Sequence, residues 1–213
     1  GEAPGLFYGY VTQGIVQKED ITENGIKYIK QDGSVGYYQT VNKTTPVAGD
    51  VKYVDRNGDG VVDDNDRDII GNPNPDFTYG FQTKVSWKSL SLSASFNGVQ
   101  GRDILNVGNR YNNTPGTKSN NVTRKAFQNM WTDENPSNLY PKSTFVVQNM
   151  VMDRYVEDGS YLRCSDITLS YVLPAKWTNK IGIKNTSVYA SVKNAFVITD
   201  YSGYDPEVNS FAF

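Results

Sequence analysis

The chain of 213 residues is 38% hydrophobic and 21% charged with a net charge of −2, which argues against a disordered tail, a helical membrane protein and a nucleic-acid-binding surface. It contains no histidine and a single cysteine, Cys164. An internal disulfide, a Cys-based zinc site and the usual Ser/His or Cys/His nucleophilic sites are therefore excluded, and most hydrolase chemistry with them.

The first segment, residues 1–54, is predicted to be mainly loop. Short strand-like pieces at Leu6–Val11, Lys27–Ile29 and Val51–Val54 are separated by turns rich in Gly, Asp, Asn and Pro. In the whole chain, fifteen Tyr, nine Phe and nineteen Gly favour strands over helices.

An acidic loop follows at residues 55–66, with the sequence D-R-N-G-D-G-V-V-D-D-N-D. Its spacing matches a calcium-binding loop in which side-chain oxygens and one backbone carbonyl supply the ligands. The predicted metal ligands are Asp55, Asn57, Asp59, Val61, Asp63 and Asp66. Asp66 stands where Glu is usual, and flanking helices are missing. A weak, structural calcium site and a metal-free surface turn therefore both remain open.

A strand hairpin is predicted at residues 77–97. Apolar and polar residues alternate from Phe77 to Trp87 and again from Leu90 to Asn97, with only Lys88 and Ser89 between the two runs. Such a short connection predicts an antiparallel pair joined by a tight turn.

The long segment 98–159 is predicted to be a loop that contains one short helix near 122–131. Asn121 or Thr123 can cap the start of this helix, and Pro136 ends the helical pattern. The predicted apolar face of the helix consists of Val122, Ala126, Phe127, Met130 and Trp131.

A second strand pair is predicted at residues 160–198, with strands at Ser160–Leu173 and Thr186–Ile198, and residues 199–213 are predicted to be loop. If successive strands are antiparallel, the short connections fall at one end of the sheet and the long ones at the other. This arrangement is typical of a transmembrane β-barrel. The same alternation occurs in any half-buried soluble sheet, so the pattern by itself also allows a β-sandwich.

Six ordered blocks of sequence carry a family resemblance. They are Gly1–Ile15, Gly49–Asp66, Ile70–Phe81, Val156–Arg163, Ile167–Pro174 and Asn194–Val208. Through these blocks the chain resembles the C-terminal part of a SusC/RagA-type TonB-linked outer-membrane transporter. The expected fold class is all-β with one short helix in a long loop, its antiparallel strands coming from the C-terminal part of a transmembrane β-barrel.

The resemblance implies a barrel of about 22 strands with an N-terminal plug. It also implies import of glycans or peptides across the outer membrane of a Gram-negative bacterium, together with the TonB system and a SusD-like surface lipoprotein. Because a signal peptide, a plug, a TonB box and enough strands to close such a barrel are missing, we expect a fragment that is not transport-competent. In water its apolar face, with Phe81, Trp87, Leu92 and Phe96, would need cover, so we expect a sandwich-like or dimeric sheet.

No enzymatic activity is expected. The acidic residues Glu134, Glu157, Asp158, Asp205 and Glu207 are interpreted as solvated loop charges and not as a glycosidase pair. The loop aromatic residues are interpreted as packing anchors, and the alternative use is stacking on a sugar. They are Tyr8, Tyr10, Tyr111, Trp131, Tyr140, Tyr201 and Tyr204. The alternative function is a soluble, calcium-stabilised β-sandwich module that binds carbohydrate.

Overall fold

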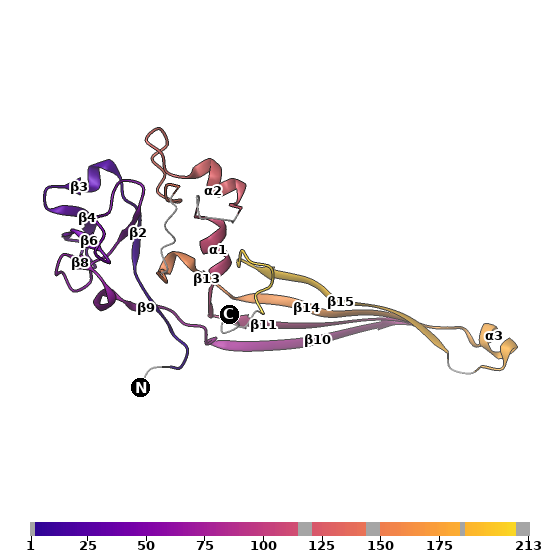
Figure 1. Cartoon of the computed structure of the whole chain (residues 1–213). Helices are drawn as coiled ribbons and strands as arrows, with labels where there is room; N and C mark the ends of the chain where they lie inside the picture. Colours follow the sequence, from indigo (N-terminus) through magenta and orange to yellow (C-terminus); the bar gives the residue numbers. More distant parts are fainter. Residues whose placement is uncertain (1–2, 115–120, 144–149, 184–185, 208–213) are drawn as a thin grey trace. The chain divides into compact units, whose positions relative to one another are not determined.

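The computed structural model describes residues 3–114, 121–143, 150–183 and 186–207. The chain divides into two compact units. Among the described residues, one comprises residues 3–73 and 104–157 and is called the loop unit; the other comprises residues 74–103 and 158–207 and is called the sheet unit. Figure 1 labels their helices and strands along the chain.

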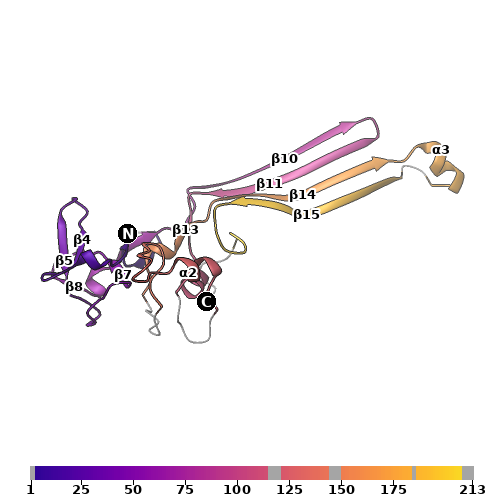
Figure 2. The same ribbon diagram turned by 90° about the horizontal axis from the view of Figure 1, so that it is seen from above.

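The sheet unit is built on four long antiparallel strands in the order β10-β11-β14-β15. β10 (Phe77–Trp87) pairs with β11 (Leu90–Gln100), β11 pairs with β14 (Tyr161–Val172), and β14 pairs with β15 (Ser187–Thr199). The strands run side by side in a single layer (Figure 2). The observed strands and their antiparallel pairing confirm the all-β fold class.

One face of this sheet is apolar across all four strands. The register places Val85 opposite Leu92 and Leu92 opposite Leu169. Apolar residues therefore lie next to apolar residues of the neighbouring strands, and polar residues next to polar ones. The apolar face consists mainly of Phe77, Tyr79, Phe81, Val85, Trp87, Leu90, Leu92, Ala94, Phe96, Leu162, Cys164, Ile167, Leu169, Tyr171, Val188, Ala190, Val192, Phe196 and Ile198.

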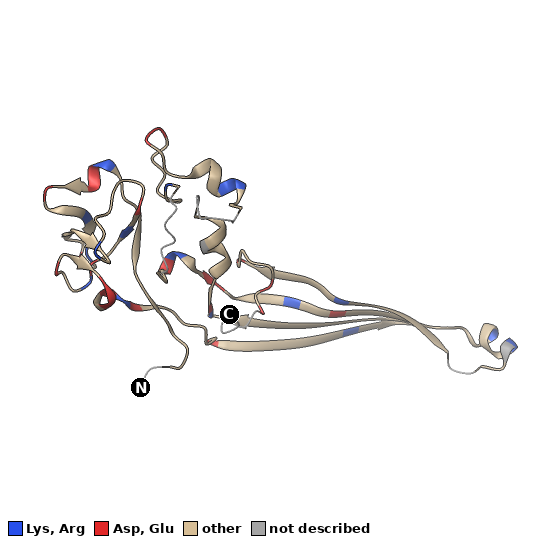
Figure 3. Ribbon diagram, in the orientation of Figure 1, with Lys and Arg blue, Asp and Glu red and all other residues tan. Residues whose placement is uncertain are grey.

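The opposite face carries every charged residue of the four strands. Figure 3 shows how few these are, and they are Lys84, Arg163, Asp166 and Lys193. The Lys193 ammonium lies 2.6 Å from the Asp166 carboxylate. The Arg163 guanidinium lies 2.6 Å from the carboxylate of Asp205, on the chain that follows β15. The two faces therefore differ sharply in polarity.

The expected sandwich is not formed within the chain. In the described part of the sheet unit, no second sheet covers the four strands, and the face with Phe81, Trp87 and Leu92 stays exposed, Trp87 by 68%. The sandwich alternative was wrong because it assumed that strands of one chain would fold onto each other, and the dimeric alternative stays a prediction. Instead all four pair edge to edge through hydrogen-bonded ladders, with register shifts at Ser95–Phe96 and at Cys164–Asp166.

The structure also contains more helices than the one that the sequence predicted. Three short α-helices occur among the described residues: α1 (Val107–Asn112), α2 (Arg124–Asn129) and α3 (Ala175–Thr178), the last continuing into the 3-10 turn η4 (Asn179–Ile181). α2 lies within the predicted helix, and the Thr123 hydroxyl caps it by accepting the N–H of Ala126 at 3.1 Å. Each of these helices is too short to show a clear apolar period in the sequence. In the parts of the chain that the structure describes, no helix is long and apolar enough to cross a membrane.

The loop unit consists of many short strands around a core of its own. Its strands and 3-10 turns are β1 (Phe7–Gly9), β2 (Thr12–Ile15), η1 (Lys18–Asp20), β3 (Ile21–Thr22), β4 (Gly25–Ile29), β5 (Val35–Tyr38), β6 (Thr40–Val41), β7 (Val51–Tyr53), β8 (Val61–Val62), η2 (Asp64–Asp66), β9 (Asp68–Gly71) and η3 (Asp153–Tyr155). The pairs are β1-β9, β2-β7, β3-β4-β5 and β6-β8, and β12 (Asp103–Leu105) pairs with β13 (Val156–Asp158) where the chain passes between the units.

Three tyrosines centre the core of the loop unit. Tyr28, Tyr38 and Tyr53 are almost completely buried, and each hydroxyl has a hydrogen-bond partner, which for Tyr53 is the Met152 sulfur at 3.7 Å. The Tyr28 hydroxyl donates to the carbonyl of Asp55 at 2.7 Å, and the Tyr38 hydroxyl accepts the N–H of Tyr53 at 3.1 Å. Trp131 joins the same core from the segment after β12. Two segments predicted to be loops thus share one hydrophobic core.

Candidate functional site

The predicted metal loop begins two residues after β7 and includes β8 and η2. Gly58 and Gly60 both have left-handed backbone angles, with φ of 77° and 86°, and a Cβ added to either residue would meet no other atom within 4 Å. Glycine is therefore required here for conformation and not for space. These two residues turn the chain back so that the first and last carboxylates of the loop face inward.

Asp55 is buried, with 2% of its surface exposed. One carboxylate oxygen accepts the N–H of Gly58 at 2.6 Å, and the other accepts the N–H of Gly60 at 2.8 Å. Burial raises the pKa of the Asp55 carboxyl above its ordinary value, and the neighbouring Asp66 and Asp59 carboxylates raise it further. The hydrogen bonds from the N–H groups of Gly60 and Gly58 lower the pKa and offset this rise only in part.

Asp66 is completely buried at the other end of the loop. Its Oδ1 accepts the N–H of Arg56 at 2.8 Å and the N–H of Asn57 at 3.3 Å, and its Oδ2 accepts the N–H of Asp63 at 2.8 Å. The Asp66 side chain thus ties the end of the loop to its beginning.

The middle of the loop is held by short-range turns. Asn57 Oδ1 accepts the N–H of Asp59, and Asp59 Oδ1 accepts the N–H of Val61, each at 2.9 Å. Asp63 Oδ1 accepts the N–H of Asn65 at 2.8 Å. The loop is therefore ordered by its own hydrogen bonds. Over the described residues, no three Asp, Glu, His or Cys side chains form a group placed to hold a metal ion.

Sequence reasoning missed the role of Asp64, which lies between two predicted ligands. Its carboxylate accepts a hydrogen bond from the Tyr10 hydroxyl at 3.1 Å and lies 3.7 Å from the Arg67 guanidinium. Burial and this carboxylate raise the pKa of Tyr10 to about 12. The contact spans 54 positions of sequence, so no local pattern could have indicated it.

Three of the acidic residues outside the loop, Glu157, Asp205 and Glu207, contact neighbouring side chains. Glu157 accepts hydrogen bonds from Asn106 and Asn109 at 3.0 and 2.7 Å. Asp205 and Glu207 both contact Arg163, at 2.6 and 3.3 Å. These carboxylates therefore link neighbouring segments of the chain.

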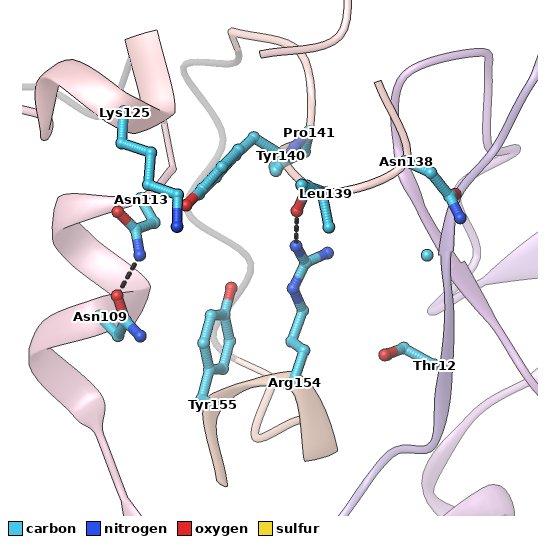
Figure 4. Close-up of a pocket in the computed structure, with 11 residues that line it drawn as sticks. Thr12, Asn109, Asn113, Lys125, Asn138, Leu139, Tyr140, Pro141, Arg154 and Tyr155 are labelled. Atoms are coloured by element: carbon cyan, nitrogen blue, oxygen red, sulfur yellow. Dashed lines mark hydrogen bonds between the residues drawn. The ribbon is translucent and has the colours of Figure 1, made fainter. Parts of the chain in front are cut away.

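A pocket of about 340 Å3 lies entirely in the loop unit. Figure 4 shows its walls: Asn109 on α1 and Asn113 just after it, Lys125 on α2, Arg154 and Tyr155 on η3, and Thr12 on β2, with residues 138–141 across the top. Of the loop aromatics, only Tyr140 lines it; Tyr10 and Trp131 are buried in the core, and Tyr204 is exposed. Gly14, with φ of 82°, allows Asn138 to approach, because an added Cβ would lie 2.2 Å from Asn138 Oδ1.

Comparison with known proteins identifies relatives along nearly the whole chain, although no protein-family model matches it. TonB-dependent receptor P3 of Formosa agariphila is 33% identical over 210 residues, which cover 98% of this chain and 19% of that protein. TonB-dependent receptor P26 of the same organism is 34% identical over 170 residues. TonB-dependent receptor SusC of Bacteroides thetaiotaomicron is 34% identical over 165 residues, which cover 74% of this chain and 15% of SusC. The chain thus spans about a fifth or less of the length of these relatives.

Solved structures show the same fold. The RagAB peptide transporter matches 94% of this chain with a TM-score of 0.63 at 23% identity, and the match covers 20% of that transporter chain. The RagAB peptide importer in its open-open state matches 97% with a TM-score of 0.60 at 24% identity.

Proposed function

Because the chain belongs to the family of SusC- and RagA-type TonB-dependent receptors, we propose that it forms part of an outer-membrane nutrient importer. The observation that carries the proposal is the sheet unit, with its apolar face on one side and all of its strand charges on the other. A barrel wall between lipid and an aqueous lumen needs this division. A soluble β-sandwich module would instead need a second sheet over the apolar face.

The dimensions of the strands support the same proposal. At about 3.3 Å per residue, the run from Phe77 to Trp87 is about 33 Å long. A tilt of about 40° would reduce its height across a membrane to about 25 Å, the height of the apolar band of outer-membrane barrels. Aromatic residues lie near both ends of this band, with Phe77 and Tyr79 at one end and Trp87 and Tyr171 at the other.

The lengths of the connections give the proposed orientation. Lys88 and Ser89 alone join β10 to β11, and residues 173–186 join β14 to β15. At the opposite strand ends, the chain leaves β11 for the loop unit and returns at β14. Outer-membrane barrels have short periplasmic turns and long external loops. The loop unit would therefore belong to the external side.

The outer edges of β10 and β15 require further strands. Neither strand has a second partner in the described sheet, and an open edge is not viable in lipid because its N–H and C=O groups would be unpaired. In the proposed importer these edges pair with other strands of the same barrel. The 213 residues would then be one part of the wall and would not transport anything alone.

The proposed partners come from the family. The RagAB structures are named as a peptide transporter and a peptide importer, and the other relatives are named as receptors that depend on TonB. By analogy, the whole protein would act with TonB and a SusD-like surface lipoprotein, would import a glycan or a peptide, and would have no enzymatic activity.

Calcium in the acidic loop is a second part of the proposal. Hard oxygen donors suit calcium, and a divalent ion would stabilise the ionised form of Asp55, whose pKa is raised mainly by burial and further by the Asp66 and Asp59 carboxylates. An ionised carboxylate has about four lone-pair positions. Asp55 uses two of its positions and Asp66 uses three for backbone N–H groups. Asp66 would therefore bind through one oxygen at most, and the site would be weaker than one that ends in Glu.

The calcium proposal is tested by melting temperature. Calcium should raise the melting temperature of the wild type by an amount that depends on its concentration. Asp55→Ala combined with Asp59→Ala should abolish the rise, and magnesium at equal ionic strength controls for charge screening. An equal response in the double variant would rule out the site.

Transport is tested by placing one charge on each face of β11. Ala94 lies on the apolar face near mid-strand, and its neighbour Ser93 lies on the polar face. In the full-length receptor, Ala94→Arg should sharply reduce barrel assembly and nutrient uptake, because arginine on the lipid face near mid-membrane costs about 2–4 kcal/mol. Ser93→Arg should assemble nearly normally. Equal assembly of both variants would contradict a lipid-facing sheet.

A further inference from the structure

We propose that the pocket of the loop unit in Figure 4 binds an organic carboxylate. Two cationic side chains, those of Lys125 and Arg154, line the pocket, and no acidic residue does. The chain as a whole carries a net charge of −2. The pocket is therefore positively charged although the chain as a whole is slightly negative, and its electrostatic field favours an anion.

The acids nearest in sequence to the lining residues are already engaged. Asp153 accepts hydrogen bonds from the N–H of Thr12 at 3.1 Å and from its hydroxyl at 2.6 Å. Glu157 accepts the side-chain amides of Asn106 and Asn109. Among the residues that the structure describes, Lys125 forms no ion pair. Its ammonium charge thus remains available to a ligand.

Two donors of the pocket also lack acceptors among the described residues, and the Arg154 donor is buried. One terminal nitrogen of Arg154 donates to the carbonyl of Leu139, whereas the other, Nη1, is buried and has no hydrogen-bond partner. Tyr155 is 8% exposed, and its hydroxyl has no partner in the described part of the chain. Buried donors of this kind are normally satisfied by ordered water or by a ligand. A carboxylate is the group that the arginine fork matches in plane and in charge.

The remaining lining selects an organic acid over an inorganic anion. Leu139, Pro141 and the ring of Tyr140 supply apolar surface next to the cations, and Figure 4 shows the Lys125 ammonium and the Tyr140 hydroxyl pointing toward each other. A site with convergent polar groups on an apolar wall fits a ligand with a carbon body. The carboxylate could belong to a peptide C-terminus or to a uronic acid, and the chemistry of the contacts is the same for both.

The experiment is equilibrium binding to the full chain in detergent, measured by calorimetry. The probes form two matched pairs: a tripeptide acid with its C-terminal amide, and a galacturonic acid trisaccharide with its methyl ester. In at least one pair the acid should bind about tenfold or more tightly than its neutral form, since one charge-assisted hydrogen bond contributes at least that ratio. The pair that shows the difference identifies the source of the carboxylate.

Variants link the binding to this pocket. Lys125→Gln and Tyr155→Phe should each reduce acid binding several-fold and leave the neutral form unchanged, and Tyr155→Phe keeps the buried ring. Lys27→Gln, an exposed lysine on β4 outside the pocket, should have no effect. The proposal is overturned by equal binding of acid and neutral forms in both pairs, by unchanged acid binding in both pocket variants, or by inorganic phosphate binding as tightly. The site goes beyond the transport proposal, and binding is measured without uptake, so either claim can fail alone.

Discussion

Phe81 on β10 and Phe96 on β11 stack across the sheet, with ring centroids 4.6 Å apart and ring planes inclined by 16°. The ring centroid of Phe196 on β15 lies 6.4 Å from that of Phe96. Cross-strand aromatic pairs of this kind fix the register in which neighbouring strands pair. These three rings therefore connect β10, β11 and β15 on the apolar face of the sheet.

We predict that Phe81 and Phe96 are energetically coupled. In a double-mutant cycle with Phe81→Leu and Phe96→Leu, the interaction should be about 0.5–1.5 kcal/mol beyond the effects of the single changes. Unfolding by urea in lipid bilayers measures it. Phe81→Leu combined with Val188→Ala is the control, because these side chains lie on different strands in different rows, and their effects should add. A coupling of zero for the stacked pair would contradict the prediction.

The Asp66 carboxylate is predicted to be the main anchor of the acidic loop, with or without metal. Asp66→Asn replaces one acceptor oxygen by a donor that faces a backbone N–H, so the free energy of unfolding should fall by about 1–3 kcal/mol. Asp59→Asn is the matched control, because Asp59 is exposed and its change should cost less than about 1 kcal/mol. Chemical denaturation in the presence of a chelator tests this. Equal losses in both variants would show that burial of Asp66 is not decisive.

Gly14 and Gly33 provide a matched test of close packing, since both have φ of 82°. Gly33→Ala meets no neighbouring atom within 4 Å and should cost only about 1–2 kcal/mol, the strain of a left-handed residue. Gly14→Ala should cost clearly more, because it must also displace Asn138, which accepts the N–H of Ile15 at 2.9 Å. The difference between the two losses, measured by thermal unfolding, isolates the packing cost. Equal losses would mean that Asn138 moves freely.

Buried Tyr38 should make stability depend on pH in alkaline solution. Burial raises the pKa of Tyr38 above its ordinary value of 10.0, so the unfolded chain releases this proton first as pH rises. The stabilisation of the wild type relative to Tyr38→Phe is therefore fully present below pH 10 and should decline above it by about 1.4 kcal/mol per pH unit. Denaturant unfolding at pH 8 and pH 11 measures the difference. A constant difference between the two proteins would contradict this account.

The sequence predicted the long strands because their pattern is local. Phe77–Trp87 and its neighbours alternate over ten or more residues, and a two-residue connection leaves only one way to pair them. The short turns in the acidic loop were also foreseeable, since Asp, Asn and Gly form such turns with their own backbone. What was missed in the loop is the complete burial of Asp66, which depends on the residues around it.

The loop unit could not be predicted in this way. Tyr28, Tyr38 and Tyr53 are buried, yet the strands that carry them have only five, four and three residues, too few to show a period. The core also joins residues far apart in the chain: the Trp131 indole donates to Gln17, 114 positions away. The predicted apolar face of α2 was wrong at Phe127, which is 61% exposed. The helix α2 has only six residues, fewer than two turns, and one side of it faces solvent.

The most direct test is which face of β10 meets lipid. Val85 lies on the apolar face and Ser86, the next residue, on the polar face. In a Cys164→Ser background, Val85→Cys and Ser86→Cys are each labelled with an environment-sensitive fluorophore in the full-length receptor in liposomes that contain brominated lipid. We predict strong quenching at position 85 and weak quenching at position 86. Equal quenching at both positions, or stronger quenching at position 86, would contradict a membrane-spanning sheet.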